Sequence, residues 1–192
     1  SDKSGNTFYF GEGSTNRMEN TKPGWTAGAG SSTFRWALNK VIDVNGNQTI
    51  LSYAKDGGTL YLTNIAYNAN INSPTIAATH TVGFILTNRA DTNLTFQSGY
   101  RVEMRKRLAE IQVKAAGDNV RKYVLDYINS PSTTRSLLAE VTEYGSDYVT
   151  AFPPITFSYQ VKPFEFAAET NWSGVSAQGL TDGANNAISA GD

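Results

Sequence analysis

Apolar side chains recur at every second position over long stretches of this chain, and this spacing constrains its fold more than any other feature. In the clearest run, residues 155–161, Ile, Phe, Tyr and Val alternate with Thr, Ser and Gln. Residues 34–39, 82–87 and 120–127 show related alternation. A period of two places successive side chains on opposite faces of an extended strand, so these runs predict half-buried β-strands.

Turn-forming residues separate these runs. Asn45-Gly46, Asp56-Gly57-Gly58 and Ala116-Gly117 each lie between two strand-like segments, and such sequences supply the positive φ angles of tight hairpin turns. The spacing between strands is short, which favours antiparallel pairing through hairpins. We therefore predict an all-β fold of about ten antiparallel strands with little helix, arranged as a meander or a sandwich-like curved sheet.

Two segments leave a helical alternative open. Residues 102–114, with Met104, Leu108, Ile111 and Val113, and residues 137–141, with two Leu and a Glu, could also be helical. We interpret both as strands, and the slip in period near Ala109-Glu110 as a β-bulge. Residues 38–67 and 108–144 also resemble each other as strand, turn and Tyr-bearing strand; this indicates either an internal repeat or simply two meanders.

The composition narrows the classes of function. Of the 192 residues, 40% are hydrophobic and only 17% are charged, with a net charge of −1. This balance gives no basis for electrostatic capture of nucleic acid or of an anionic membrane. No apolar run approaches the roughly 18 residues of a membrane-spanning helix. The absence of cysteine excludes disulfides and thiol chemistry, and a single histidine excludes a histidine-rich metal site.

Few segments suggest chemistry. Residues 43–47 are rich in side-chain oxygens, but they lack the later acidic ligand of a calcium loop and are better explained as a hairpin turn. The basic cluster at 101–107 contains Glu103, which favours a solvated face or an interface over a phosphate site. His80 begins a strand-like run and has no recognisable triad partner. We predict no catalytic residue, no metal site and no cofactor.

Two tryptophans are candidate binding residues. Trp25 and Trp172 both lie in Gly- and Ser-rich surroundings near the two ends of the chain. An exposed tryptophan can form a platform for a sugar ring, but a packing role is the commoner use of such a residue.

Several strings in the sequence match a known family, in order, from about residue 8 to residue 161. They are Phe-Tyr-Phe-Gly at 8–11, Arg-Trp-Ala-Leu-Asn-Lys-Val-Ile-Asp-Val-Asn-Gly-Asn at 35–47, and Ser-Gly-Tyr-Arg-Val-Glu at 98–103 followed by Arg107-Leu108. Further strings are Ser-Pro-Ser-Thr at 130–133, Arg-Ser-Leu-Leu at 135–138, Val-Thr-Glu-Tyr-Gly-Ser-Asp at 141–147 and Pro-Pro-Ile-Thr-Phe-Ser-Tyr at 153–159. The insert at 68–79 matches nothing in this pattern.

This ordered set resembles the SpvB-like region of bacterial virulence-plasmid B proteins, of the B subunits of insecticidal toxin complexes and of related Rhs/YD-repeat secreted proteins. The resemblance implies an SpvB-like β domain over residues 1–163, in which 11–32 form an irregular loop. It also implies that 164–192 form a polar linker toward a missing FG-GAP-type propeller. Asp192 would be only the first ligand of a calcium loop, so we expect no calcium there.

The resemblance further implies a non-catalytic scaffold module of a larger secreted bacterial toxin-like protein, contributing to a β-rich shell. Its expected partners are the propeller and YD repeats of the parent protein and a toxin-complex subunit, without nucleic acid and without membrane insertion. The sequence contains no Glu-x-Glu pair of the kind that ADP-ribosyltransferases in some relatives require. The alternative function is an extracellular binding module, either glycan-recognising or a cell-surface adhesin, which requires an exposed aromatic platform.

Overall fold

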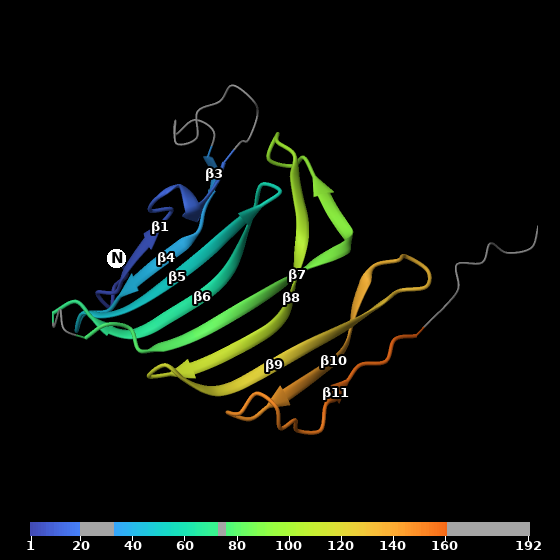
Figure 1. The fold of residues 1–192 in the computed structure, drawn as a ribbon. Coiled ribbons are helices and arrows are strands. Elements are labelled where there is room, and N and C mark those ends of the chain that lie inside the picture. Colours follow the sequence, from blue (N-terminus) through green and yellow to red (C-terminus); the bar gives the residue numbers. More distant parts are fainter. Residues whose placement is uncertain (20–32, 73–75, 161–192) are drawn as a thin grey trace, which may run out of the picture. The chain divides into compact units, whose positions relative to one another are not determined.

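A computed structural model describes residues 1–19, 33–72 and 76–160. Nine strands form one antiparallel sheet in the order β1-β4-β5-β6-β7-β8-β9-β10-β11 (Figure 1). They are β1 (Thr7–Phe10), β4 (Leu38–Ile42), β5 (Asn47–Asp56), β6 (Thr59–Asn70), β7 (His80–Thr95), β8 (Val102–Ala115), β9 (Asp118–Asn129), β10 (Ser136–Tyr144) and β11 (Ile155–Thr156). A second sheet pairs β2 (Arg17–Glu19) with β3 (Thr33–Trp36).

The predicted all-β class is confirmed, and the arrangement is an open meander. From β4 onward each strand pairs with the next strand along the chain. The strand β1 pairs with β4 and is the edge strand at that end of the sheet. The described residues contain one short 3-10 turn, η1 (Ser14–Asn16), and no α-helix. They accordingly include no helix of the length and apolarity needed to cross a membrane. Both segments with a helical alternative are strands, within β8 and β10.

The strand register sorts the side chains of the large sheet onto two unlike faces. Directly paired residues share a face, so Leu51, Ile65, Val82 and Val113 form one apolar row across four strands. The neighbouring row on the opposite face runs Ser52, Asn64, Gly83, Gln112, Lys122 and Tyr144. The alternation seen in the sequence therefore produces one apolar face and one mainly polar face, on which Ile50 and Ile85 are exposed exceptions.

Three β-bulges interrupt this sheet in the same way. Each begins at a leucine, and the ladder then skips one residue: Asn39 after Leu38, Ala109 after Leu108, and Ala139 after Leu138. The bulge predicted near Ala109-Glu110 is confirmed. A bulge removes a residue from the hydrogen-bonded ladder and increases the local twist.

At each bulge, the leucine carbonyl accepts a hydrogen bond from the hydroxyl of a tyrosine that lies on the segment following that leucine's strand. Tyr53 donates to the carbonyl oxygen of Leu38 at 2.7 Å, Tyr127 to that of Leu108 at 2.8 Å, and Tyr159 to that of Leu138 at 2.7 Å. Burial raises the pKa of Tyr53 and of Tyr127, which keeps both hydroxyls protonated as donors. The two stretches that resemble each other in sequence, 38–67 and 108–144, share this local geometry.

The outer part of the β7–β8 hairpin turns away from the plane of the other strands (Figure 1), and a polar cluster holds the corner. The register of β7 shifts between Asn88 and Asn93. Within this shift, Asp91 pairs with Arg89 at 2.8 Å and accepts hydrogen bonds from the backbone N–H and hydroxyl of Ser136. Ser136 begins β10, which is not a neighbour of β7 in the sheet.

Arg107 completes this corner cluster. Its guanidinium donates to the Ser136 hydroxyl at 2.7 Å and lies 4.5 Å above the Tyr127 ring. The Asp91 side chain is only 5% exposed. The bond to Arg89 first, and then the bonds to Ser136, hold the pKa of Asp91 far below the ordinary value of an aspartate. The corner is thus held by the Arg89–Asp91 ion pair and by its hydrogen bonds to Ser136, which link β7 to β10 although these strands are not neighbours in the sheet.

The predicted turns lie where the sequence placed them. Gly57 and Gly58, and likewise Ala116 and Gly117, are two-residue loops with positive φ at both positions, as type I′ hairpin turns require. The 43–47 segment is a hairpin turn as expected. Asp43 accepts hydrogen bonds there from the Asn47 side-chain amide and from the backbone N–H groups of Asn45 and Asn47. The bond from the Asn47 side chain first, and then the backbone bonds, lower the pKa of Asp43.

The segment predicted as an irregular loop, 11–32, needs a partial correction. Its first part contains η1 and β2, because Arg17–Glu19 finds a pairing partner in β3 that is distant in sequence. Residues 20–32 lie outside the described part. The insert at 68–79 ends β6 and leads into β7, and Asn70 and Asn72 both donate to the carbonyl of Asn45 at 3.1 Å. The insert thereby braces the β4–β5 turn.

The chain divides into two units, Ser1–Val161 and Lys162–Asp192. The second unit falls outside the described residues. The β domain over 1–163 and the linker over 164–192 therefore stay predictions.

Removing the hydroxyl at a bulge should destabilise the fold. Tyr53→Phe and Tyr127→Phe each leave a leucine carbonyl without its donor, and we expect each to lower the free energy of unfolding by about 1 kcal/mol. Chemical denaturation measures the change. Tyr9→Phe is the matched control, because the Tyr9 hydroxyl has no hydrogen-bond partner among the described residues. Equal stability of all three variants and the parent chain would contradict the role assigned to these hydroxyls.

Replacing the corner carboxylate should change how stability depends on pH. The folded-state pKa of Asp91 lies below that of an unfolded aspartate, about 3.9, so Asp91 stabilises the fold above that pH. This contribution declines as the pH falls toward the folded-state pKa. We expect Asp91→Asn to lower the melting temperature at pH 7 and to reduce its fall between pH 4 and pH 2.

Thermal unfolding across that pH range tests the Asp91 prediction. Glu143→Gln is the control, since it removes an ion pair with Arg121, a side chain that is 56% exposed, and exposed pairs contribute little. An Asp91→Asn variant that follows the parent chain at every pH would disprove the assignment.

One turn can be improved. Ala116 has a φ of 53°, which costs an L-residue other than Asn or Gly about 1–2 kcal/mol. We expect Ala116→Asn, which creates the favoured Asn-Gly pair, to raise the free energy of unfolding by about 0.5–1 kcal/mol. Chemical denaturation measures the free energy of unfolding of this variant. The control is Ala151→Asn, a substitution at an exposed position without a positive φ. A gain of equal size in both variants would show that the turn is not its source.

Candidate functional site

The apolar face of the sheet is one candidate interaction surface among the described residues. It is defined by Leu51, Tyr53, Ile65, Tyr67, Val82, Phe84, Leu108, Ile111, Val113, Tyr123, Leu125, Tyr127, Leu138 and Val141. None of these side chains is buried. The buried hydrophobic residues in the described part are instead Met18, Ala69 and Val102. The apolar face is thus half-buried at best, although burial of such side chains is the main driving force of folding.

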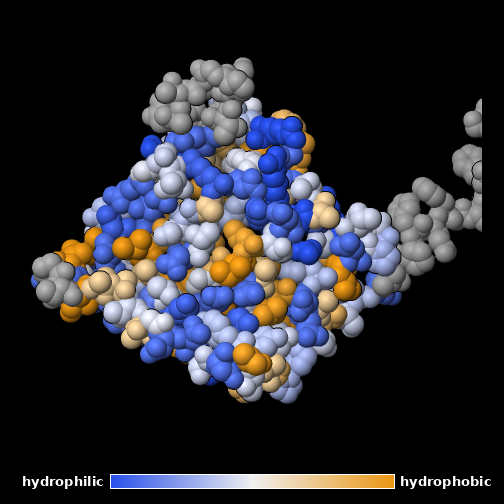
Figure 2. Space-filling view, in the orientation of Figure 1, coloured by the Kyte–Doolittle hydropathy of each residue, from blue (hydrophilic) through white to orange (hydrophobic). Residues whose placement is uncertain are grey.

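Exposed aromatic residues extend this face to both edges of the sheet. Phe8 and Phe10 on β1 are 41% and 56% exposed. At the other edge, the exposed side chains of Ile155, Phe157 and Tyr159 follow the same alternation. Figure 2 shows apolar side chains reaching the surface between polar ones. Exposed apolar side chains at both edges of one face are consistent with an interaction surface.

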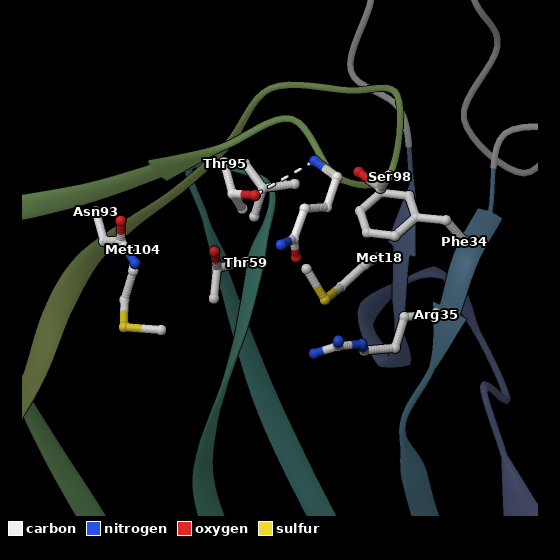
Figure 3. Close-up of a pocket in the computed structure, with 10 residues that line it drawn as sticks. Met18, Phe34, Arg35, Thr59, Asn93, Thr95, Ser98 and Met104 are labelled. Atoms are coloured by element: carbon white, nitrogen blue, oxygen red, sulfur yellow. Dashed lines mark hydrogen bonds between the residues drawn. The ribbon is translucent and has the colours of Figure 1, made fainter.

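A pocket of about 400 Å³ lies apart from the apolar face (Figure 3). Three elements wall it: the β2–β3 sheet, the turn between β5 and β6, and the outer β7–β8 hairpin. The lining residues are Met18, Phe34, Arg35, Thr59, Asn93, Thr95, Gln97, Ser98, Val102 and Met104. Both methionines of the chain are among them. The volume is within the range of ligand sites.

Specific contacts hold the pocket walls together. The Glu103 N–H donates to the carbonyl of Gly57 at 2.7 Å, and the Thr59 hydroxyl donates to the carbonyl of Glu103 at 2.9 Å. A Cβ at position 57 would lie 2.7 Å from that same Glu103 oxygen, so the close approach requires glycine. The Phe34 ring lies 5.8 Å from that of Tyr100. The walls are therefore held in position without a ligand.

Among the described residues, the charged side chains around the pocket are ion-paired except for Arg35. Glu19 pairs with Lys55 and Arg17, while Glu103 pairs with Arg101 and Arg105. These bonds, that to Arg101 first, lower the pKa of Glu103. No described residue pairs with the guanidinium of Arg35, and none of the described lining residues is acidic. In Figure 3 the Arg35 side chain reaches from β3 toward Thr59.

The basic cluster at 101–107 is divided by the structure. Arg101 pairs with Glu103, and Arg105 pairs with both Glu103 and Asp56, as expected of a solvated face. Arg107 instead belongs to the corner cluster and donates to the Ser136 hydroxyl. His80 begins β7, and its ring Nδ1 lies 3.0 Å from the Thr79 hydroxyl and 3.3 Å from the Asn68 amide. These neighbours are neutral, so His80 has the partners of a structural residue.

The predicted candidates Trp25 and Trp172 lie outside the described residues, and their binding role stays a prediction. Within the described ranges, no group of three or more acidic or histidine side chains is placed to hold a metal ion. Sequence reasoning did not find the pocket, because its walls come from segments that are far apart in the chain.

Comparison with known proteins supports the fold suggested by the sequence motifs. No protein-family model and no curated protein matches the sequence. Among solved structures, the chain is similar to the N-terminal domain of the effector protein SpvB from Salmonella typhimurium strain LT2. The TM-score is 0.63 at 14% identity, over 75% of this chain and 59% of that one.

The chain is also similar to structures of toxin complexes. The Photorhabdus luminescens Tc holotoxin pore gives a TM-score of 0.65, and TcdB2-TccC3-Cdc42 gives 0.62, both at 16% identity over 82% of this chain. The chain spans only 10% of each of those chains. The expected resemblance to SpvB and toxin-complex proteins is therefore confirmed as a shared SpvB-like β fold.

Proposed function

We propose that this chain is a non-catalytic structural module of a larger secreted toxin-like protein, in which its apolar face is covered by neighbouring parts. The observation that carries the proposal is that none of the side chains of the apolar face is buried. A single sheet cannot cover its own face, and soluble proteins rarely leave such a surface open. The fold shared with SpvB and with toxin-complex structures supports the same role.

The proposed partners are a propeller and YD repeats of the parent protein, together with a toxin-complex subunit. Both edge strands offer additional contact surface, since no described strand pairs with the outer side of β1 or β11 and both strands carry exposed aromatic or branched side chains. Secretion from a bacterium is part of this proposal. The neutral surroundings of His80 support a role without catalysis.

Thiol labelling tests the proposal, because the chain has no cysteine of its own. Val82→Cys places a thiol on the apolar face, and Thr81→Cys places one on the polar face of the same strand. Each variant is prepared as this chain and within the longer protein that its gene encodes. A maleimide reagent then reports the labelling rate of each thiol.

We expect Val82→Cys to label at least about tenfold more slowly in the longer protein, because burial excludes the reagent. Thr81→Cys should label at similar rates in both. Equal labelling of Val82→Cys in the two proteins, or protection of Thr81→Cys alone, would refute the proposal. A gene that encodes no further domain would refute it as well.

A further inference from the structure

We infer that the pocket between the β2–β3 sheet, the β5–β6 turn and the outer β7–β8 hairpin binds an acidic saccharide. This inference goes beyond the proposed scaffold role and does not depend on it. The pocket has three chemical parts: an apolar floor, a neutral polar rim and one unpaired cation. Each part matches a different portion of a sugar ring that bears a carboxylate.

The floor is apolar and preorganised. Met18 and Val102 are 6% and 8% exposed and rank among the most buried side chains in the described residues. The Phe34 ring beside them offers a flat apolar surface. The C–H face of a pyranose ring packs on such a surface, and a pre-formed wall reduces the entropy lost on binding.

The rim consists of amide and hydroxyl side chains. Asn93, Thr95, Gln97 and Ser98 come from the end of β7 and the loop that follows it. Amides and hydroxyls both donate and accept hydrogen bonds, as do the hydroxyl groups of a sugar. A purely apolar ligand such as an alkyl chain would leave these groups desolvated without partners, which is unfavourable.

Arg35 selects an anion. In β3 it is directly paired with Met18 of β2, so its side chain lies on the same side as the floor residue. No described carboxylate pairs with it, in contrast to the ion-paired arginines at positions 17, 89, 101 and 105. A guanidinium binds a carboxylate through two parallel hydrogen bonds. The pocket volume, about 400 Å³, accommodates a ligand of one or two sugar rings.

Calorimetric titration of the 192-residue chain tests the inference with matched ligands. The acidic probes are 3′-sialyllactose, glucuronate and galacturonate; the neutral counterparts are lactose, glucose and galactose. Decanoate probes the alternative of a fatty-acid site. We expect at least one acidic sugar to bind at least about tenfold more tightly than its neutral counterpart, the scale of one charge-assisted hydrogen-bonded pair.

Two variants assign the binding to the pocket. Arg35→Gln should remove the preference for the acidic sugar, and Asn93→Ala should weaken binding of the same sugar. Both residues are exposed, so folding is expected to be retained. Arg121→Gln is the control, because Arg121 is an exposed arginine of β9 and does not line the pocket; it should bind like the parent chain.

Three results would overturn the inference. They are the absence of binding by every acidic sugar, unchanged preference in Arg35→Gln, and binding of decanoate without any sugar. None of these results bears on whether the apolar face is covered in the longer protein. Failure of this proposal and failure of the scaffold role can therefore be distinguished.

Discussion

The structure depends on one constraint: a single β-sheet has two faces, and the described part of the chain builds only one large sheet. Strand alternation concentrates Leu51, Ile65, Val82 and Val113 on one face, yet the few buried hydrophobic residues lie elsewhere. Most domains solve this problem with a second packed layer. This sheet gains its cohesion from backbone ladders and half-buried side chains, and within the described residues no second layer buries its apolar face.

The departures from a regular ladder follow from the same constraint. A wide sheet must twist, and the bulges after Leu38, Leu108 and Leu138 introduce local twist at three places. Each bulge would leave a carbonyl poorly satisfied, and a tyrosine hydroxyl on the following segment satisfies it. The repetition of this device explains why distant parts of the sequence look alike.

The corner in the β7–β8 hairpin connects the fold to the candidate ligand site. The cluster around Asp91 holds the inner part of the corner against β10, and the contact of Gly57 with Glu103 holds the outer part against the β5–β6 turn. The pocket lies between that outer part and the small β2–β3 sheet. A site of this kind on a rigid frame has little to reorganise when a ligand enters.

The sequence by itself determined most of the strands, most of their turns and the bulge near Ala109, because these depend on local backbone preferences and on a period of two. The run at 155–161, which shows the clearest alternation, was wrong as a half-buried strand: only Ile155–Thr156 forms a strand, and residues 155–160 are exposed. The ordered motifs also indicated the SpvB-like fold that the structural comparisons support. The pairing of β2 with β3 inside a segment expected to be irregular was missed, since it depends on a partner distant in the chain.

Only the tertiary structure decided that no side chain of the apolar face is fully buried among the described residues, that Arg107 belongs with Ser136 and Tyr127, and that Met18, Arg35 and Asn93 line one pocket. The physical reason is that burial and charge pairing depend on how strands cross and bend in space. Local periodicity specifies which face a side chain occupies, but it does not specify what lies opposite that face.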